Sequence, residues 1–252
     1  MTSASRWVFG VVLSVLWCAT GGPAAAEDLS AQRILERMDQ VIYGFDDQIM
    51  DVKMTVVDTD GSSKSYQFTI YQKGAQQRLV RFTSGEVQGM ATLVESPTRM
   101  YVYLPGFKKV RQVAAHAMGQ TFAGSDYTMD DISNPTFASR YQAALDREDD
   151  HHWYLVLTPK SGENPLYPRV EITVQKGTFF QNETRYFDEK GRLVKTMSCS
   201  EPKDYHGRSR YSVIVLKDAR TGHSTRFDIL DFRVNQGLKD SMFTVRELQW
   251  SR

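Results

Sequence analysis

The spacing of apolar side chains along the chain changes at Gly44. Before this glycine, apolar side chains recur at helical spacing from Ile34 to Ile42, and charged side chains occupy the opposite face. Ser30 or Asp28 is suited to cap the start of this helix, and Gly44 is suited to end it. The pattern predicts one amphipathic helix, and it leaves open whether the helix packs on a sheet or covers the mouth of a cavity.

After Gly44, apolar and polar side chains alternate in short segments, which is typical of antiparallel strands with one apolar face. Turn sequences such as residues 58–61, 188–191 and 219–222 separate these segments. The predicted strands are Met50–Val56, Ser65–Ile70, the segment around Val80 and Phe82, Met90–Val94, Met100–Leu104, Lys109–Val113, Trp153–Leu157, Arg169–Val174, Thr178–Phe187, Arg192–Cys199, Tyr211–Lys217 and Ser224–Val234. About eleven strands are too many for a flat open sheet, so we expect a mainly-β fold whose antiparallel sheet is strongly curved or forms a partial (half) barrel.

Two segments depart from the alternating pattern. Ala114–Leu145 contains a short helical candidate, Tyr127–Ile132, and Ser125 or Asp126 is suited to cap its start. The tail Leu238–Leu248 mixes helix and strand signals, so we predict no single element there.

The first residues carry the features of a secretory signal peptide. Arg6 precedes the uncharged apolar run Trp7–Trp17, and small residues ending in Ala26 follow. The run is shorter than the roughly 20 residues that a membrane-spanning helix needs. We therefore expect residues 1–26 to be a signal peptide that is cleaved after Ala26, with an uncleaved anchor as the alternative. The chain exported to the periplasm is then residues 27–252, in which no repeat or linker marks a domain boundary.

Charge and cysteine content narrow the possible partners. Removal of the signal peptide leaves 30 basic and 30 acidic side chains, so the net charge gives no basis for binding nucleic acid. Cys199 is then the one remaining cysteine, which excludes a disulfide within the chain. We interpret Cys199 as a small buried side chain rather than a reactive thiol, because it lies in a predicted strand.

No sequence motif indicates an enzyme. The histidines are scattered, and the one local cluster, residues 149–152, is typical of a charged hairpin tip rather than a metal site. The chain has no nucleophile elbow, zinc-protease motif, phosphate-binding loop or dinucleotide fingerprint. We predict no catalytic residues, no metal and no cofactor, and we keep an envelope hydrolase with an unrecognised site as a third possibility.

Two segments carry a family resemblance. Tyr101–Arg111 (YVYLPGFKKVR) and Phe122–Ile132 (FAGSDYTMDDI) resemble the LolA-like outer-membrane lipoprotein-sorting proteins, and they are more similar to the less-characterised branch of that family than to LolA itself. The resemblance implies a LolA/LolB-like unclosed barrel, with helices over its concave side and acyl chains held in the space between. It also implies transport from an inner-membrane exporter, of the ABC or RND type, to an outer-membrane acceptor.

The apolar row of the early strands is the predicted acyl-chain site. Methionines give such a wall adaptability, and aromatic rings give it broad flat surfaces. The alternative is that the row is ordinary core beneath the helices. The predicted ligand-binding residues are Met50, Val52, Met54, Val56, Tyr66, Phe68, Ile70, Val80, Phe82, Met100, Val102 and Leu104.

Two further segments are assigned roles. Gly119–Ile132 is a candidate lid, in which Phe122, Gly124 and Tyr127 are the key residues; a fixed loop is the alternative. The basic strand is a candidate docking site for a partner, and a charged edge that guards against aggregation is the alternative. Its predicted docking residues are Lys108, Lys109 and Arg111.

We therefore predict a monomeric periplasmic carrier that shuttles the acyl chains of lipids or lipoproteins between the inner and outer membrane. The second hypothesis is a lipid-sensing or lipoprotein-sensing regulatory module of the same fold, similar to RseB, that acts through a membrane protein partner. RseB-like proteins have a second domain, for which this chain has no room.

Overall fold

The computed structural model describes residues 29–249, and the predicted signal peptide lies outside the described residues. Within them, all strands belong to one antiparallel sheet of 13 strands. The strands are β1 (Asp47–Val57), β2 (Ser63–Lys73), β3 (Gln77–Ser84), β4 (Ala91–Ser96), β5 (Arg99–Leu104), β6 (Lys109–Gln112), β7 (Tyr141–Glu148), β8 (His152–Pro159), β9 (Arg169–Gln175), β10 (Gln181–Phe187), β11 (Leu193–Tyr205), β12 (Arg208–Asp218) and β13 (Ser224–Val234). The helices are α1 (Ala31–Tyr43), α2 (Met129–Ser133) and α3 (Val245–Gln249), with single 3-10 turns at Pro105–Phe107, Ala115–Ala117 and Asp240–Met242.

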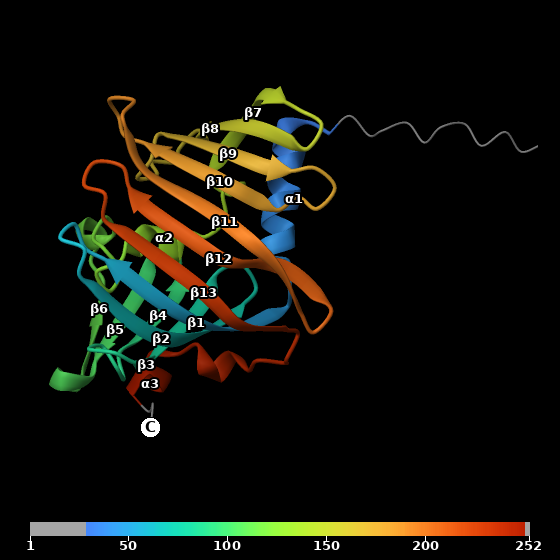
Figure 1. Cartoon of the computed structure of the whole chain (residues 1–252). Helices are drawn as coiled ribbons and strands as arrows, with labels where there is room; N and C mark the ends of the chain where they lie inside the picture. The colour runs from blue at the N-terminus through green and yellow to red at the C-terminus, as the bar shows by residue number, and fades with distance from the viewer. Residues whose placement is uncertain (1–28, 250–252) are drawn as a thin grey trace, which may run out of the picture.

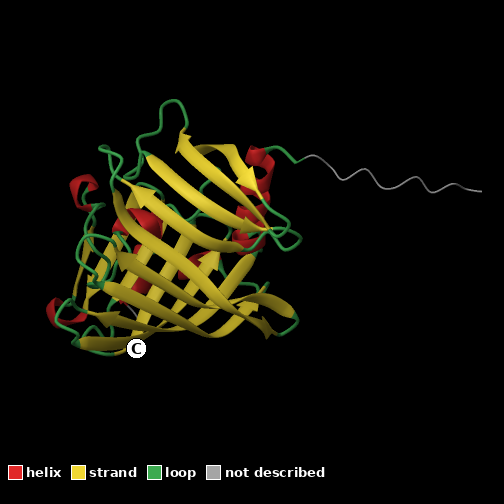
Figure 2. Cartoon of the chain, turned by 45° about the horizontal axis from the view of Figure 1, so that its top comes forward, coloured by secondary structure: helices red, strands yellow, loops and turns green. Residues whose placement is uncertain are grey.

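The sheet consists of two meanders joined along one seam. Strands β1 to β6 follow one another outward on one side, strands β13 to β7 do so on the other, and β1 pairs with β13 at the centre. β6 and β7 are the two edges and do not pair with each other. The sheet curves strongly and stays open, as Figures 1 and 2 show. The predicted unclosed, mainly-β architecture is confirmed, although the sheet has 13 strands rather than about eleven.

The alternating pattern places one apolar row on the concave face. The strand register pairs Met50 with Ile70, Ile70 with Val80, and Val80 with Thr92, so these side chains lie side by side across four strands. The neighbouring row pairs Val52 with Phe68 in the same way. Because side chains along a strand alternate between faces, this register puts the whole predicted row on one side of the sheet.

Helix α1 packs against this concave face near the β7 edge. Ser30 accepts a hydrogen bond from the backbone N–H of Arg33, and Gly44 follows the last turn, as the sequence predicts. Ile34, Leu35 and Met38 are fully buried in the same cluster as the apolar row. The amphipathic stripe of the helix therefore covers part of the inner wall of the sheet (Figure 1).

Helix α2 begins two residues later than predicted. Its N-cap is Thr128, which forms a reciprocal capping box with Asp131. The prediction that Ser125 or Asp126 caps the helix is wrong, because both side chains form other hydrogen bonds. The Ser125 hydroxyl donates to the carbonyl of Phe122, and the Asp126 carboxylate accepts hydrogen bonds from the β13 side.

Strand β7 was not predicted by the sequence pattern. Only its first residue, Tyr141, is well buried, and most of the following side chains face solvent at the sheet edge. An edge strand with one exposed row lacks the apolar alternation that reveals a buried strand. Four predicted boundaries were also too wide: Met90 precedes β4, Val113 follows β6, residues 178–180 belong to the turn before β10, and Arg192 precedes β11.

The tail packs on the opposite, convex face. Phe243 and Leu248 are buried against Leu79 and Leu93, whose side chains point away from the concave side. Helix α3 therefore does not cover the concave face, and only α1 and α2 do so (Figure 1). Within residues 29–249 no helix has the length and apolar character needed to cross a membrane.

Candidate ligand-binding cavity

The space between the concave face and its covering helices contains two adjoining hollows of more than 100 Å³ and a third of about 60 Å³. The larger hollow, about 480 Å³, lies between the C-terminal end of α1 and strands β11 and β12. The smaller hollow, about 120 Å³, lies between the segment that carries α2 and strands β1, β2, β3, β12 and β13. The walls of both include Tyr43, Tyr127, Arg210 and Ile214. Ligand pockets in proteins are typically about 300–1,000 Å³, so the larger hollow is within the usual range.

The predicted acyl-chain residues divide into three groups. Five line the smaller hollow: Met50, Val52, Phe68, Ile70 and Val80. Five pack in the same hydrophobic cluster without lining either hollow: Met54, Val56, Tyr66, Phe82 and Met100. Two are half-buried near the sheet edge, outside both hollows and this cluster: Val102 and Leu104. The row is thus partly cavity wall and partly ordinary core.

The C-terminal half of the sheet supplies walls that the sequence analysis did not assign. Met197 and Cys199 of β11 line the larger hollow, and Phe227 of β13 lines the smaller one. The alternation in these strands was visible, but nothing in the sequence showed that β13 pairs with β1. Burial raises the pKa of the Cys199 thiol to about 12, so it stays protonated and behaves as a small apolar side chain.

Besides the exposed Arg208, which lines the larger hollow, two arginines that are not exposed interrupt these apolar walls. Arg78 of β3 donates hydrogen bonds to the side-chain oxygen of Gln72 and to the carbonyl of Ile132. Arg210 of β12 lies over the ring of Phe232, with its guanidinium carbon 4.4 Å from the ring centroid. Burial lowers the pKa of both guanidinium groups.

The candidate lid closes the smaller hollow from above. Phe122 and Tyr127 both line this hollow, and the Tyr127 ring meets the Phe227 ring edge-to-face, 5.2 Å between centroids. Gly124 is exposed and adopts a positive φ of 74°, a conformation that glycine tolerates best. The segment thus turns at Gly124 and presents aromatic rings to the cavity on either side.

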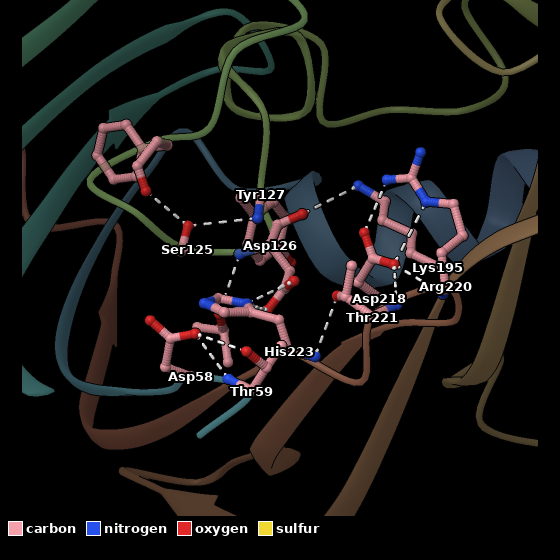
Figure 3. A network of polar contacts seen from close by, with 12 residues as sticks. Asp58, Thr59, Ser125, Asp126, Tyr127, Lys195, Asp218, Arg220, Thr221 and His223 are labelled. Atoms are coloured by element: carbon pink, nitrogen blue, oxygen red, sulfur yellow. Dashed lines mark hydrogen bonds and ion pairs between the residues drawn. The ribbon is translucent and has the colours of Figure 1, made fainter. Parts of the chain in front are cut away.

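A polar cluster anchors this segment to β11, to β13 and to the turn that precedes β13. Figure 3 shows His223 pointing toward Asp126, and the His223 Nδ1 atom lies 2.9 Å from a carboxylate oxygen of Asp126. The Thr225 hydroxyl donates to the same carboxylate at 2.7 Å. The Lys195 ammonium donates to Asp131 at 2.6 Å. The FAGSDYTMDDI segment is therefore held by buried carboxylates at two points.

The predicted docking residues lie at the β6 edge. Lys108, Lys109 and Arg111 are all exposed, and none forms an ion pair with any of the described residues. Lys109 and Arg111 lie on the same face of β6, opposite Leu104 and Val102 of β5. Phe107, at the turn before β6, is 70% exposed, and the sequence analysis did not single it out.

Comparisons with known proteins agree on the fold. A family model described as "Uncharacterized protein" matches residues 74–250. A DUF1329 family protein from Desulfovibrio piger is 27% identical, with a TM-score of 0.80 over 86% of this chain and 97% of that one. No curated protein matches the chain.

Two further crystal structures have the same fold. A putative outer membrane lipoprotein-sorting protein domain from Vibrio parahaemolyticus is 21% identical, with a TM-score of 0.75 over 87% of this chain and 98% of that one. A LolA superfamily protein from Nitrosomonas europaea is 23% identical, with a TM-score of 0.72 over 86% of this chain and 99% of that one. The predicted LolA-like fold is therefore confirmed.

One buried carboxyl joins α1 to the end of the α2 segment. Asp39 is 7% exposed, and its Oδ2 atom accepts a hydrogen bond from the backbone N–H of Ala138 at 2.7 Å. Its Oδ1 atom has no hydrogen-bond partner among the described residues. Burial raises the pKa of the Asp39 carboxyl to about 7, and the backbone donors offset only part of this effect.

We predict that Asp39 makes the protein less stable as pH rises. Since the folded protein binds the Asp39 proton more tightly than the unfolded chain does, the stabilisation is complete below about pH 4 and is lost as pH rises through about 7. The loss amounts to up to about 1.4 kcal/mol per pH unit in this window. Asp39→Asn should flatten the pH dependence of the free energy of unfolding measured with urea, whereas Glu36→Gln, on the exposed face of α1, should leave it unchanged. Equal pH dependence in Asp39→Asn and wild type would contradict the prediction.

Proposed function

The chain belongs to the family of uncharacterized proteins whose model matches residues 74–250, and from this premise and its LolA-like fold we propose that it is a periplasmic carrier of lipid or lipoprotein acyl chains. In this proposal it takes the chains from an exporter in the inner membrane and moves them toward an acceptor in the outer membrane. The proposal includes no catalytic step, no metal and no cofactor.

The observation that carries the proposal is the cavity beneath α1 and α2. Sheltering an acyl chain of about 14 methylenes from water requires roughly 11 kcal/mol, at ~0.8 kcal/mol per buried CH₂. The two hollows together offer a place for such a chain, and the smaller one is walled by apolar side chains from both meanders, such as Met50, Phe68 and Phe227. Methionine and aromatic walls adapt to chains of different shape, which suits a protein that must bind and release.

Filling the cavity should abolish lipid binding. Ile214 is half-buried and lines both hollows, so Ile214→Trp fills space that the proposal assigns to the ligand. Wild-type protein recovered from the periplasm should carry lipid detectable by native mass spectrometry, and the Ile214→Trp protein should carry several-fold less while remaining folded.

Val215→Trp is the matched control. Val215 follows Ile214 on β12, so the new ring lies on the opposite face of the sheet, away from the cavity. This variant should keep its lipid. Undiminished lipid in a folded Ile214→Trp protein would contradict the proposal, and so would wild-type protein that neither carries lipid nor binds an added fatty acid.

The segment Gly119–Ile132 acts in this proposal as a movable lid over the smaller hollow. Its opening must break the contacts of Asp126, whose side chain is 7% exposed, with His223 and Thr225. Removing the carboxylate in Asp126→Ala should cost about 1–3 kcal/mol in the closed state and so favour opening.

Hydrogen exchange of backbone amides in residues 119–132 should measure this change. Exchange should be faster in Asp126→Ala than in wild type, and bound fatty acid should slow it in both. Asp188→Ala, at the tip of the β10–β11 hairpin, is the control and should leave exchange in the lid unchanged. Uniformly slow exchange across the segment, insensitive to ligand, would show that it is a fixed loop.

The β6 edge serves in this proposal as the docking site for an acidic patch on the exporter or for anionic headgroups. Reversing the charges of Lys108, Lys109 and Arg111 to Glu should slow delivery of a labelled fatty-acyl lipid from anionic donor vesicles. Binding of the same lipid in solution should not change, since these side chains line neither hollow. Lys190→Glu, on a distant hairpin tip, is the control, and an unchanged delivery rate in the triple variant would rule out docking through this edge.

A further inference from the structure

Arg78 and Arg210, the two arginines of the larger and smaller hollows that are not exposed, have no acidic partner among the described residues. Neither Arg78 nor Arg210 forms an ion pair with any residue in the described part of the chain. Both line the smaller hollow, and Arg210 lines the larger hollow as well. A buried charge in a folded protein is normally paired, because removing it from water costs several kcal/mol.

Arg210 is the less satisfied of the two. Its Nε atom is buried and has no hydrogen-bond partner among residues 29–249. Its guanidinium group lies over the Phe232 ring and forms no hydrogen bond with another side chain of the described residues. A ring face satisfies none of the five N–H donors of a guanidinium group, so Arg210 has donors available toward the cavity.

Arg78 is held firmly, but only by neutral groups. Its side chain is 6% exposed, and its hydrogen bonds go to the amide oxygen of Gln72 and to the carbonyl of Ile132. These bonds fix the guanidinium group in place and leave its positive charge uncompensated. The result is a rigid cationic position in a wall that is otherwise mainly apolar.

The carboxylate of the cavity wall is already engaged. The larger hollow has no acidic residue in its lining, and the smaller hollow has Asp131. The Asp131 carboxylate is paired with Lys195 at 2.6 Å and accepts hydrogen bonds from Thr128. Once this pair is set aside, the two guanidinium groups leave the cavity with an excess positive charge.

Tyr43 adds a neutral donor at the same place. It lines both hollows, and its hydroxyl forms no hydrogen bond with the described residues. Burial raises the pKa of the Tyr43 phenol, so the group stays protonated and can donate. The two cations and the phenol all line the smaller hollow and form an arrangement that suits an oxyanion.

We propose that the cavity selects amphiphiles with an anionic head, whose carboxylate or phosphate oxygens bind Arg78 and Arg210 while the acyl chain lies along the apolar walls. This inference rests on the proposed carrier function and deepens it, since it names the chemical class of the head. The head then supplies the negative charge that the chain itself does not place beside the two arginines.

The test compares ligands that share a palmitoyl chain and differ in the head. Protein from the periplasm, stripped of bound lipid, is titrated by calorimetry with palmitate, palmitoyl lysophosphatidylglycerol and monopalmitin. The two anionic ligands should bind roughly ten- to hundred-fold more tightly than the neutral monopalmitin, because hydrogen bonds to charged groups are the stronger ones. Inorganic phosphate alone is titrated as a fourth probe and should bind far more weakly than either anionic lipid.

Substitution of the arginines should remove the preference and keep the chain binding. In Arg210→Gln the two anionic ligands should lose roughly ten-fold or more in affinity, while monopalmitin binds as before. Arg78→Gln should have the same effect. Should Arg78→Gln fail to fold because its bonds to Gln72 are changed, Arg210→Gln decides, since the Arg210 side chain donates no hydrogen bond within residues 29–249. Lys217→Gln removes one charge from the opposite face of β12 and should keep the wild-type preference.

The possible results separate this inference from the carrier function. Equal binding of monopalmitin and palmitate by wild type would overturn the head selection and leave the carrier function standing. Unaltered preference in a folded Arg210→Gln and Arg78→Gln pair would also overturn it. If inorganic phosphate bound as tightly as the phospholipid, the site would be one for a small anion. That result would overturn the inference that the ligand is an amphiphile. Failure of all three lipids to bind would overturn the carrier function itself.

Discussion

The structure depends on one constraint: a strongly curved sheet with an apolar concave face cannot cover that face by itself, because its edges β6 and β7 never meet. The face must be shielded from water, since burying apolar surface is the main driving force of folding. Helix α1 and the segment with α2 provide this shield, and a helix of 13 residues with one of 5 is a small cover for 13 strands. The incomplete cover leaves the two hollows.

The cover is fastened by polar groups rather than by apolar packing alone. Asp39 holds α1 to the chain after α2, and Asp126 and Asp131 hold the stretch before and within α2. Each of these contacts is specific in direction and breaks as a unit, whereas apolar contacts fade gradually with distance. Such fastening suits the proposed lid, because opening it requires these few polar contacts to break together.

Much of this fold was readable in the sequence, and the reasons for the exceptions are physical. Alternation predicted the inner row around Val52 and Phe68, because those strands have one buried and one exposed face. β7 was not predicted, because it lies at an exposed edge and most of its side chains on both faces are exposed to solvent. The cavity-wall residues of β11 to β13, Arg210 included, could not be predicted from the sequence, because their position depends on which strands pair at the seam between β1 and β13. An arginine in an alternating strand is most simply read as a solvent-facing residue, and only coordinates reveal that it faces inward.

The pairing of β1 with β13 also determines how late in folding the sheet can be completed. Each meander forms from neighbouring hairpins, but Val52 meets Ile229 only after nearly the whole chain is available. Pairing between such distant segments makes folding slow, because the entropy of closing a long loop must be lost before the contacts form. A chain that still lacks β13 therefore cannot close the seam, and its concave face stays incomplete. The same topology that shapes the cavity thus delays its assembly until β13 is available.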